Sequence, residues 1–329
     1  MKPVTTIFTR SARTAARCIL SDELAAFPTE TVYGLGANVF SEQALKKIFE
    51  AKGRPADNPL IVHISRLDQI GLLTPRIPKS ARKIIDTFFP GPITVIVPKR
   101  KEISKLVSAG LDTIGIRMPK HETAQEFLRE CGVPVAAPSA NLSGTPSPTS
   151  WMNVRDDLNG KIRCILKGRT TDVGLESTVV DCTGRRPLVL RTGAVTLEAL
   201  QSVLPETRLY TKKKTRNSHE PAAVKSPGMK YRHYSPKAHV VIVSVKKPPR
   251  LVPGVAAAYI GLTPPKEHDA TRFAHVLVCH SVDEYARRVF SFFRRCDKKH
   301  IQVICCEQVA PDGLGRALMD RITRAAHHD

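Results

Sequence analysis

A polar segment about two thirds of the way along the chain divides it into two parts, each of which must form its own hydrophobic core. Residues 212–221 read KKKTRNSHEP, a stretch without apolar periodicity that is typical of linkers. The chain has 329 residues, more than one core usually organises. We therefore predict a first domain over residues 1–208, a linker over residues 209–238 and a smaller C-terminal domain over residues 239–329.

Both parts alternate short apolar runs with helical patterns, which predicts a mixed α/β architecture. The strand-like runs are residues 60–64, 93–97, 133–137 and 177–181 in the first part, and 240–245, 255–260, 276–278 and 301–306 in the second. Ser41 is expected to cap a helix whose buried stripe contains Leu45, Ile48 and Phe49. Two helices of the second part have apolar stripes formed by Tyr285, Val289, Phe292 and Phe293 and by Leu314, Leu318 and Ile322.

The first twenty residues allow two interpretations. They carry Lys2, Arg10, Arg13 and Arg17 with several Ser and Thr and no acidic residue, a composition similar to that of an organellar transit peptide. Residues 9–20 also read as an ordinary first helix, because alanines and Ile19 recur on one face.

The chain is strongly basic, with a net charge of +21 that favours polyanionic partners such as RNA or nucleotides. Aromatic residues make up only 5% of the sequence, and no RNA-binding motif with interleaved stacking residues is present. Direct contact with tRNA therefore stays open.

The cysteine pattern and the lengths of the apolar runs bear on location. Eight cysteines are scattered without a Cys-x-x-Cys pair, which argues against a zinc site or a disulfide scaffold and favours a reducing compartment. The longest apolar runs, such as residues 255–262 and 301–306, are too short to span a bilayer. We expect a cytoplasmic protein with no membrane partner.

Two N-terminal motifs concentrate the chemistry of small-ligand binding. They read PTETVYGLGA over residues 28–37 and KGRPADNPLIVH over residues 52–63. The threonine hydroxyls can form hydrogen bonds, and Lys52 and Arg54 can hold phosphate or carboxylate oxygens. Either motif alone is equally well explained as a turn with solvated charges. Together they suit a small anionic substrate.

Four further motifs join strand-like residues to hydroxyl, amide or guanidinium donors. They are TIGIRMP over residues 113–119, APSANLSG over residues 137–144 with Ser147 beyond it, GLESTVVD over residues 174–181 and LRTGA over residues 190–194. The familiar glycine-rich phosphate loops are absent from the sequence, so a nucleotide would need a different grip. Taken singly, each motif is also explained by local turns or a surface ion pair.

The six motifs, in this order, resemble those of the L-threonylcarbamoyladenylate synthase family, whose catalytic unit is the YrdC-like domain. The resemblance covers roughly residues 10–208, and the remaining part resembles the longer, two-domain form of the family. It implies a twisted mixed-sheet α/β domain of the YrdC type, joined by a linker to a smaller, Rossmann-like α/β domain. It also implies condensation of L-threonine, bicarbonate and ATP to L-threonylcarbamoyladenylate and pyrophosphate. The product of this nucleotidyltransferase would pass to a threonylcarbamoyl transferase complex for tRNA modification.

The resemblance also assigns roles to individual residues. The implied threonine site comprises Thr31, His63, Arg117, Ala137 and Ser177. The implied ATP site comprises Arg54, Asn58, Thr113, Ser139, Asn141, Ser147 and Arg191. We also expect an ATP contact by Tyr234, in a candidate lid described below. Lys52 and Arg54 are the expected catalytic residues, because charge builds on the phosphates during transfer. No cluster of carboxylates that could hold a metal is apparent, so Mg²⁺ is expected to accompany ATP rather than to bind the protein.

The segment KYRHY over residues 230–234 is a candidate lid that would exclude water from a labile adenylate. Tyr231, His233 and Tyr234 are its candidate contacts, and simple packing between the domains is the alternative explanation. For the whole chain, one alternative is a non-catalytic RNA-binding or ribosome-assembly factor. A second is a carbamoyl-transferring protein of the hydrogenase-maturation type, although its cysteine motifs are absent from the sequence.

Overall fold

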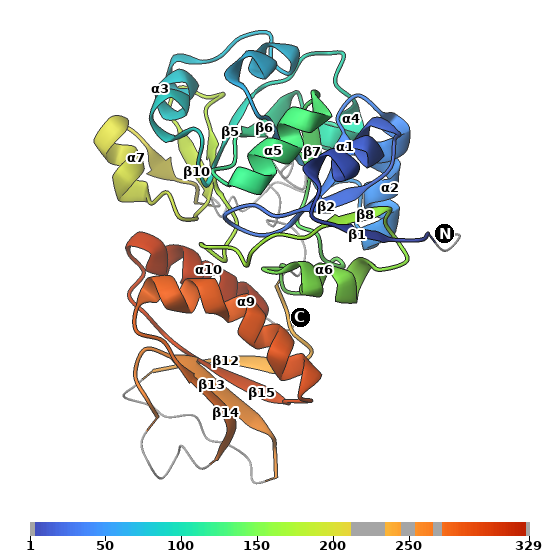
Figure 1. The fold of residues 1–329 in the computed structure, drawn as a ribbon. Helices are drawn as coiled ribbons and strands as arrows, with labels where there is room; N and C mark the ends of the chain where they lie inside the picture. The colour runs from blue at the N-terminus through green and yellow to red at the C-terminus, as the bar shows by residue number, and fades with distance from the viewer. Residues whose placement is uncertain (1–3, 212–233, 245–253, 266–271, 327–329) are drawn as a thin grey trace, which may run out of the picture.

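Two sheets organise the protein, as predicted from the division of the sequence (Figure 1). The computed structural model describes residues 4–211, 234–244, 254–265 and 272–326. Within these ranges, eleven strands form one mixed sheet and four form a second sheet. Figure 1 shows the second sheet at the bottom of the view, with the helices α9 and α10 lying between it and the larger unit. The mixed α/β fold with a second, smaller α/β domain is confirmed.

The first sheet has the strand order β1-β8-β2-β3-β7-β4-β6-β5-β9-β10-β11. Its strands are β1 (Ile7–Thr9), β2 (Ala25–Phe27), β3 (Gly34–Asn38), β4 (Ile61–His63), β5 (Ile93–Pro98), β6 (Thr113–Arg117), β7 (Val135–Ala137), β8 (Cys164–Leu166), β9 (Thr178–Asp181), β10 (Leu188–Arg191) and β11 (Arg208–Leu209). The four strands predicted in this part are confirmed as β4, β5, β7 and β9. Because β4 and β6 pair in parallel, His63 lies opposite Arg117.

Within the described part of the chain, seven α-helices and one 3₁₀ helix belong to the unit built around this sheet. They are α1 (Ala12–Leu20), α2 (Glu42–Lys52), the 3₁₀ helix η1 (Leu67–Leu72), α3 (Lys79–Phe88), α4 (Lys105–Ser108), α5 (Glu122–Cys131), α6 (Trp151–Leu158) and α7 (Leu197–Val203). The predicted cap of α2 is confirmed, because the Ser41 side chain accepts a hydrogen bond from the Ala44 amide. The predicted stripe of Leu45, Ile48 and Phe49 is buried.

The N-terminal helix begins later than predicted. It was expected to begin at Thr9 but begins at Ala12, after Ser11 accepts a hydrogen bond from the Thr14 amide as its cap. Thr9 instead belongs to β1, where it pairs with Leu166 of β8. Residues 7–20 are therefore part of the folded first domain, as the helix interpretation requires.

The second sheet consists of four parallel strands in the order β12-β15-β13-β14 among the residues that the structure describes. Its elements are β12 (His239–Val243), β13 (Ala257–Gly261), β14 (Phe273–Val278), α9 (Val282–Lys298), β15 (Val303–Glu307) and α10 (Gly313–Ala326). All four predicted strands exist, although β14 begins at Phe273 rather than Val276. The predicted stripe of α9 is buried, and on α10 Leu318 and Ile322 are buried while Leu314 is partly buried.

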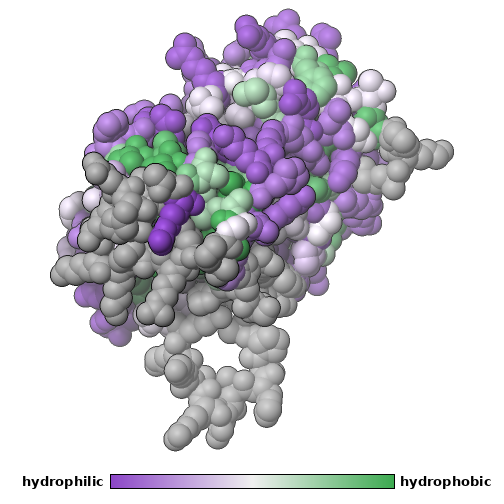
Figure 2. Space-filling view, turned by 90° about the horizontal axis from the view of Figure 1, so that it is seen from below, coloured by the Kyte–Doolittle hydropathy of each residue, from purple (hydrophilic) through white to green (hydrophobic). Residues whose placement is uncertain are grey.

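All eight cysteines are free thiols, and all are buried, including Cys305 and Cys306 in β15. In the described ranges, no helix combines the length and apolar character that a membrane span requires. Figure 2, the view from below, shows mainly hydrophilic residues on the described surface, with smaller hydrophobic areas between them.

Gly193, just after β10, lies at a position where the backbone is tightly packed. A Cβ at this position would lie 2.6 Å from the Glu176 carbonyl oxygen, and backbone cannot move aside as a flexible side chain can. We expect Gly193→Ala to lower the free energy of unfolding by about 1–3 kcal/mol, measured by urea denaturation. Gly184→Ala is the matched control, because its added Cβ would find its nearest neighbour 3.8 Å away. Equal effects of the two substitutions would contradict this view of the packing.

Candidate active site

A cavity of about 650 Å³, including its open mouth, lies where the sequence motifs converge. Its wall is formed by residues of β3, β4, β6, β7 and β10, by the loops over residues 138–147 and 176–177, and by Tyr234. The predicted site residues that line it are Arg54, His63, Arg117, Ala137, Ser139, Asn141, Ser147, Ser177, Arg191 and Tyr234.

Four predicted residues do not line this cavity. Thr31, Lys52 and Asn58 are buried beside it, where they contact residues of its wall. Thr113, at the start of β6, lines a second, smaller cavity with Val107 and Gly115. An ATP contact by Thr113 stays a prediction, and its present position places it on that second cavity.

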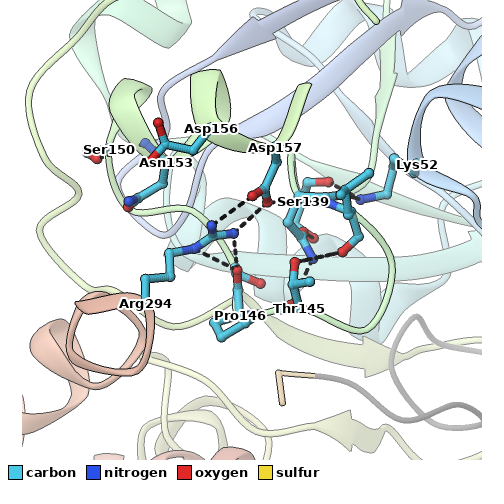
Figure 3. Close-up of polar contacts among 12 residues, drawn as sticks. Lys52, Ser139, Thr145, Pro146, Ser150, Asn153, Asp156, Asp157 and Arg294 are labelled. Carbon is cyan, nitrogen blue, oxygen red and sulfur yellow. Dashed lines mark hydrogen bonds and ion pairs between the residues drawn. The ribbon is translucent and has the colours of Figure 1, made fainter. Parts of the chain in front are cut away.

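Lys52 supports the cavity wall from behind. Its ammonium group donates hydrogen bonds to the carbonyl oxygens of Ser139, at 2.6 Å, and of Asn141. Figure 3 shows the Lys52 side chain directed toward this loop. Burial, with the nearby charge of Arg54, lowers the pKa of Lys52 well below its usual value. The catalytic role of Lys52 stays a prediction, and its visible role is to hold the loop that carries Ser139.

Arg54 presents a fixed cation to the cavity. Helix α2 ends at Gly53, whose left-handed φ of 58° turns the chain toward the site. One guanidinium nitrogen of Arg54 donates to the carbonyl oxygens of Asn58 (3.3 Å) and Pro59 (3.1 Å). Its Nε is buried and has no hydrogen-bond partner in the part of the chain that the structure describes. Burial lowers the pKa of Arg54 to about 10, so the group stays charged at neutral pH.

Arg117 is a second fixed cation, held from one side only. Its Nη2 forms an ion pair with the Glu30 carboxylate at 2.8 Å, and its Nη1 donates to the Thr31 hydroxyl at 2.8 Å. The Nε of Arg117 is buried and finds no hydrogen-bond partner among the described residues. Glu30 also accepts a hydrogen bond from the Lys120 amide, which fixes its orientation. Thr31 therefore acts here as a support for Arg117.

Arg191 and Ser177 link the two predicted substrate sites. The Nε of Arg191 donates to the Ser177 carbonyl oxygen at 3.0 Å, and its Nη2 donates to the Ser177 hydroxyl at 3.1 Å. The Ser177 hydroxyl also lies 2.8 Å from that of Thr94. A residue expected to bind ATP thus contacts one expected to bind threonine, and the two predicted sites form one continuous surface.

Tyr234 lines the cavity and also packs against the C-terminal domain. Its ring stacks on Phe290 of α9 with the ring centres 5.3 Å apart. The stacking on Phe290 agrees with packing between the domains, and the lid interpretation of residues 230–234 stays a prediction. Tyr231 and His233 lie outside the described residues.

Sequence reasoning missed several residues of the wall. The cavity is also lined by Thr29, Tyr33, Thr145 and Glu176. Thr29 was recognised as a possible hydrogen-bonding residue but was given no place in a site, and nothing local distinguishes Glu176 from a spacer within its motif. Glu30 was also missed, because its partner Arg117 is far away in the sequence.

Two family models match the chain in succession. Residues 17–193 match the Sua5/YciO/YrdC model described as "Telomere recombination". Residues 195–327 match the model described as "Threonylcarbamoyl-AMP synthase, C-terminal domain". The chain belongs to the threonylcarbamoyl-AMP synthase family.

Relatives in this family are similar over nearly their whole length. The threonylcarbamoyl-AMP synthase of Pyrococcus abyssi is 42% identical over 95% of this chain and 93% of its own. That of Bacillus subtilis is 40% identical over 95% of this chain and 92% of its own. The crystal structure of P. abyssi Sua5 with L-threonine superposes with a TM-score of 0.87 at 40% identity, covering 98% of this chain and 97% of that one.

Membership of the threonylcarbamoyl-AMP synthase family confirms the resemblance inferred from the six motifs. It also decides between the alternatives, because these relatives carry the name of a synthase over both domains and not that of an RNA-binding factor. The individual roles of the site residues stay predictions that rest on the geometry described above.

His63 gives the site a measurable pH dependence. Burial, with the adjacent charge of Arg117, lowers its pKa from 6.5 to about 3. The unfolded chain therefore binds a proton below pH 6.5 that the folded chain rejects, so stability falls as the pH drops from 6.5 toward 3. Between pH 7 and pH 5 this group should account for about 2 kcal/mol of lost stability.

The variant His63→Gln should lack this component. We expect its free energy of unfolding, measured in urea at pH 7 and pH 5, to fall by about 2 kcal/mol less than that of the wild type. The exposed His280 supplies the control His280→Gln, which should follow the wild type. An equal fall in all three proteins would show that His63 is not a buried neutral imidazole.

Proposed function

We propose that this protein condenses L-threonine, bicarbonate and ATP to L-threonylcarbamoyladenylate and pyrophosphate, for threonylcarbamoyladenosine modification of tRNA. One structural observation supports the proposal beyond family membership. Two arginines, Arg54 and Arg117, line the same cavity, and the Nε atom of each is buried and has no hydrogen-bond partner among the described residues. Buried donors are rarely left unsatisfied, so both groups call for an anionic ligand.

The contacts of the two arginines suggest that each binds a different substrate. Arg117 is held by Glu30 and Thr31 in a fixed planar orientation, which suits the carboxylate of an amino acid. The P. abyssi relative was crystallised with L-threonine, which agrees with an amino acid subsite in this family. Arg54 and Arg191 line the same cavity as Ser139, Asn141 and Ser147, and we assign the side that these five residues form to ATP.

The proposed reaction needs no nucleophile from the protein. The amine of threonine adds to bicarbonate with loss of water and forms a carbamate. A carbamate oxygen then attacks the α-phosphorus of ATP, the bond from that phosphorus to the bridging oxygen breaks, and pyrophosphate leaves with the electron pair. The contribution of the chain is to align the reactants and to balance the growing negative charge. Arg54 is suited to this because its carbonyl contacts fix it before any substrate arrives.

We further propose that Mg²⁺ enters with the phosphates of ATP. Within the described residues, no group of three His, Cys, Asp or Glu side chains is placed to hold a metal. Glu176, a carboxylate on the cavity wall, is already engaged by Ser147 and Arg321. Hand-over of the labile adenylate to a threonylcarbamoyl transferase in the cytoplasm is part of the same proposal, and the free thiols are compatible with that compartment.

The direct test is pyrophosphate release by the purified full-length protein with ATP and bicarbonate. L-Threonine should stimulate release strongly over serine or no amino acid, and mass spectrometry should detect threonylcarbamoyladenylate. Folded protein that releases no pyrophosphate under any of these conditions, and binds no nucleotide, would overturn the proposal.

Arg54→Ala should impair catalysis far more than folding. We expect kcat/KM for ATP to fall about a hundredfold, because a preorganised cation facing the phosphates is lost. The exposed Arg66, paired with Asp68 on the surface, gives the matched control Arg66→Ala with unchanged turnover. Thermal melting of both variants checks folding. Wild-type kcat/KM in a folded Arg54→Ala protein would remove Arg54 from the mechanism.

A further inference from the structure

The C-terminal domain extends one buried or nearly buried arginine from each of its two described helices, α9 and α10, into the wall of the first domain. Arg294 of α9 donates its Nε to the Pro146 carbonyl oxygen at 3.0 Å. Its Nη1 and Nη2 bind the two oxygens of Asp157 at 2.9 and 2.7 Å. Figure 3 shows this fork reaching from the helix to the loop. Both partners are nearly buried, with side-chain exposures of 10% and 12%.

The contacts of Arg294 lead directly to the cavity. Pro146 precedes Ser147, a residue of the cavity wall. Asp157 also accepts a hydrogen bond from the Leu142 amide at 3.3 Å, next to Asn141. The loop over residues 139–147 is therefore fixed from one side by Arg294 and from the other by Lys52. It carries four residues of the wall, namely Ser139, Asn141, Thr145 and Ser147.

Arg321 of α10 reaches the same wall from a second direction. Its side chain is fully buried, and its Nε donates to Glu176 at 2.9 Å. Its Nη2 donates to the Thr192 carbonyl oxygen at 2.9 Å. The guanidinium carbon lies 5.5 Å from the centre of the Tyr234 ring. The other oxygen of Glu176 accepts a hydrogen bond from the Ser147 hydroxyl, which joins this contact to the loop held by Arg294.

The charge of Arg321 also matters for an anionic ligand. Burial by itself would raise the pKa of Glu176, but the charges of Arg321 and Arg191 outweigh burial and keep the pKa below its usual value. Glu176 is therefore an ionised carboxylate on the wall of the cavity. Without Arg321 its negative charge would be compensated only in part, by Arg191, where the phosphates are expected to lie, and like charges repel strongly in a buried site.

We propose that Arg294 and Arg321 are positioning residues for the nucleotide, so that the ATP side of the cavity is complete only when the C-terminal domain is docked. This inference rests on the proposed function, because it assigns that wall to ATP. On the threonine side, Arg117 is held differently. The described contacts of Arg117 with Glu30 and Thr31 all lie within the first domain. Loss of either C-terminal arginine should therefore affect nucleotide binding and spare threonine binding.

The same two helices supply matched controls. Lys298 of α9 pairs with Asp156, and Arg316 of α10 pairs with Glu198, in ion pairs between the domains that are more exposed. Neither residue lines the cavity. The experiment compares Arg294→Met and Arg321→Met with Lys298→Met and Arg316→Met in the full-length protein. The readouts are the Kd of a non-hydrolysable ATP analogue, the KM values for ATP and threonine from pyrophosphate release, and the melting temperature.

We expect each buried variant to weaken binding of the ATP analogue and to raise the KM for ATP at least about tenfold, because a displaced wall no longer aligns the nucleotide. The KM for threonine should change less than about threefold, within the range of an unlinked substitution. Both control variants should match the wild type in all three constants. A purely structural role would lower the melting temperature without this split between ATP and threonine.

Three results would overturn the inference. They are wild-type affinity for the ATP analogue in folded Arg294→Met or Arg321→Met, an equal rise of both KM values, and an equal loss of affinity in the controls. If a methionine variant does not fold, Arg294→Lys and Arg321→Lys replace it. Lysine keeps the charge but not the planar fork, so an intermediate loss of affinity is expected and wild-type affinity would again overturn the inference.

The wild-type protein separates this inference from the proposed function. Turnover and nucleotide binding by the wild type, with equal binding by the buried variants, would overturn the inference alone. A wild type that binds the ATP analogue without releasing pyrophosphate would overturn the proposed reaction, while the affinities of the variants would still decide the inference. A wild type that binds no nucleotide would overturn both.

Discussion

The cost of burying positive charge governs how this cavity is built. A guanidinium or ammonium group removed from water is stable only where carbonyl oxygens or carboxylates replace its hydration. Lys52 meets this requirement with two loop carbonyls, Arg54 with two carbonyls of its own turn, and Arg117 with Glu30. Each solution fixes a piece of backbone as well as a charge. The loops around the cavity are held in place by the hydrogen bonds and ion pairs that they form with these cations.

The sheet sets the distances between these charges. Parallel pairing of β4 with β6 brings His63 beside Arg117, and antiparallel pairing of β4 with β7 brings Ala137 opposite Ile61. Three motifs that are far apart in the sequence therefore meet at neighbouring strands. A shift of register by one residue would turn these side chains to the opposite face of the sheet. The site depends on strand pairing as much as on its polar residues.

The sequence predicted those site residues that stand in recognisable local motifs. Arg54, Ser139 and Arg191 stand in motifs at the ends of helices or strands, and the structure brings them to one cavity. It did not find Glu30, Glu176, Arg294 or Arg321, because their partners lie far away in the sequence and no local periodicity marks an ion pair between domains. Thr113 lies at the other end of β6 from Arg117 and lines a second cavity, so its expected contact with ATP stays a prediction. The helix expected to begin at Thr9 begins at Ala12 because Thr9 pairs with β8.

The separation of Arg321 and Glu176 along the sequence has a consequence for folding during synthesis. The two residues are 145 positions apart, and Arg321 belongs to α10, which is synthesised after every strand of both sheets that the structure describes. Domains emerging from the ribosome generally fold in order, the N-terminal one first. The proposed amino acid subsite can therefore form while translation continues, whereas the proposed nucleotide wall must wait for α10. A nascent first domain would be folded but would still lack the complete nucleotide wall. The wall would be completed only when α10 has been synthesised and has packed against the first domain.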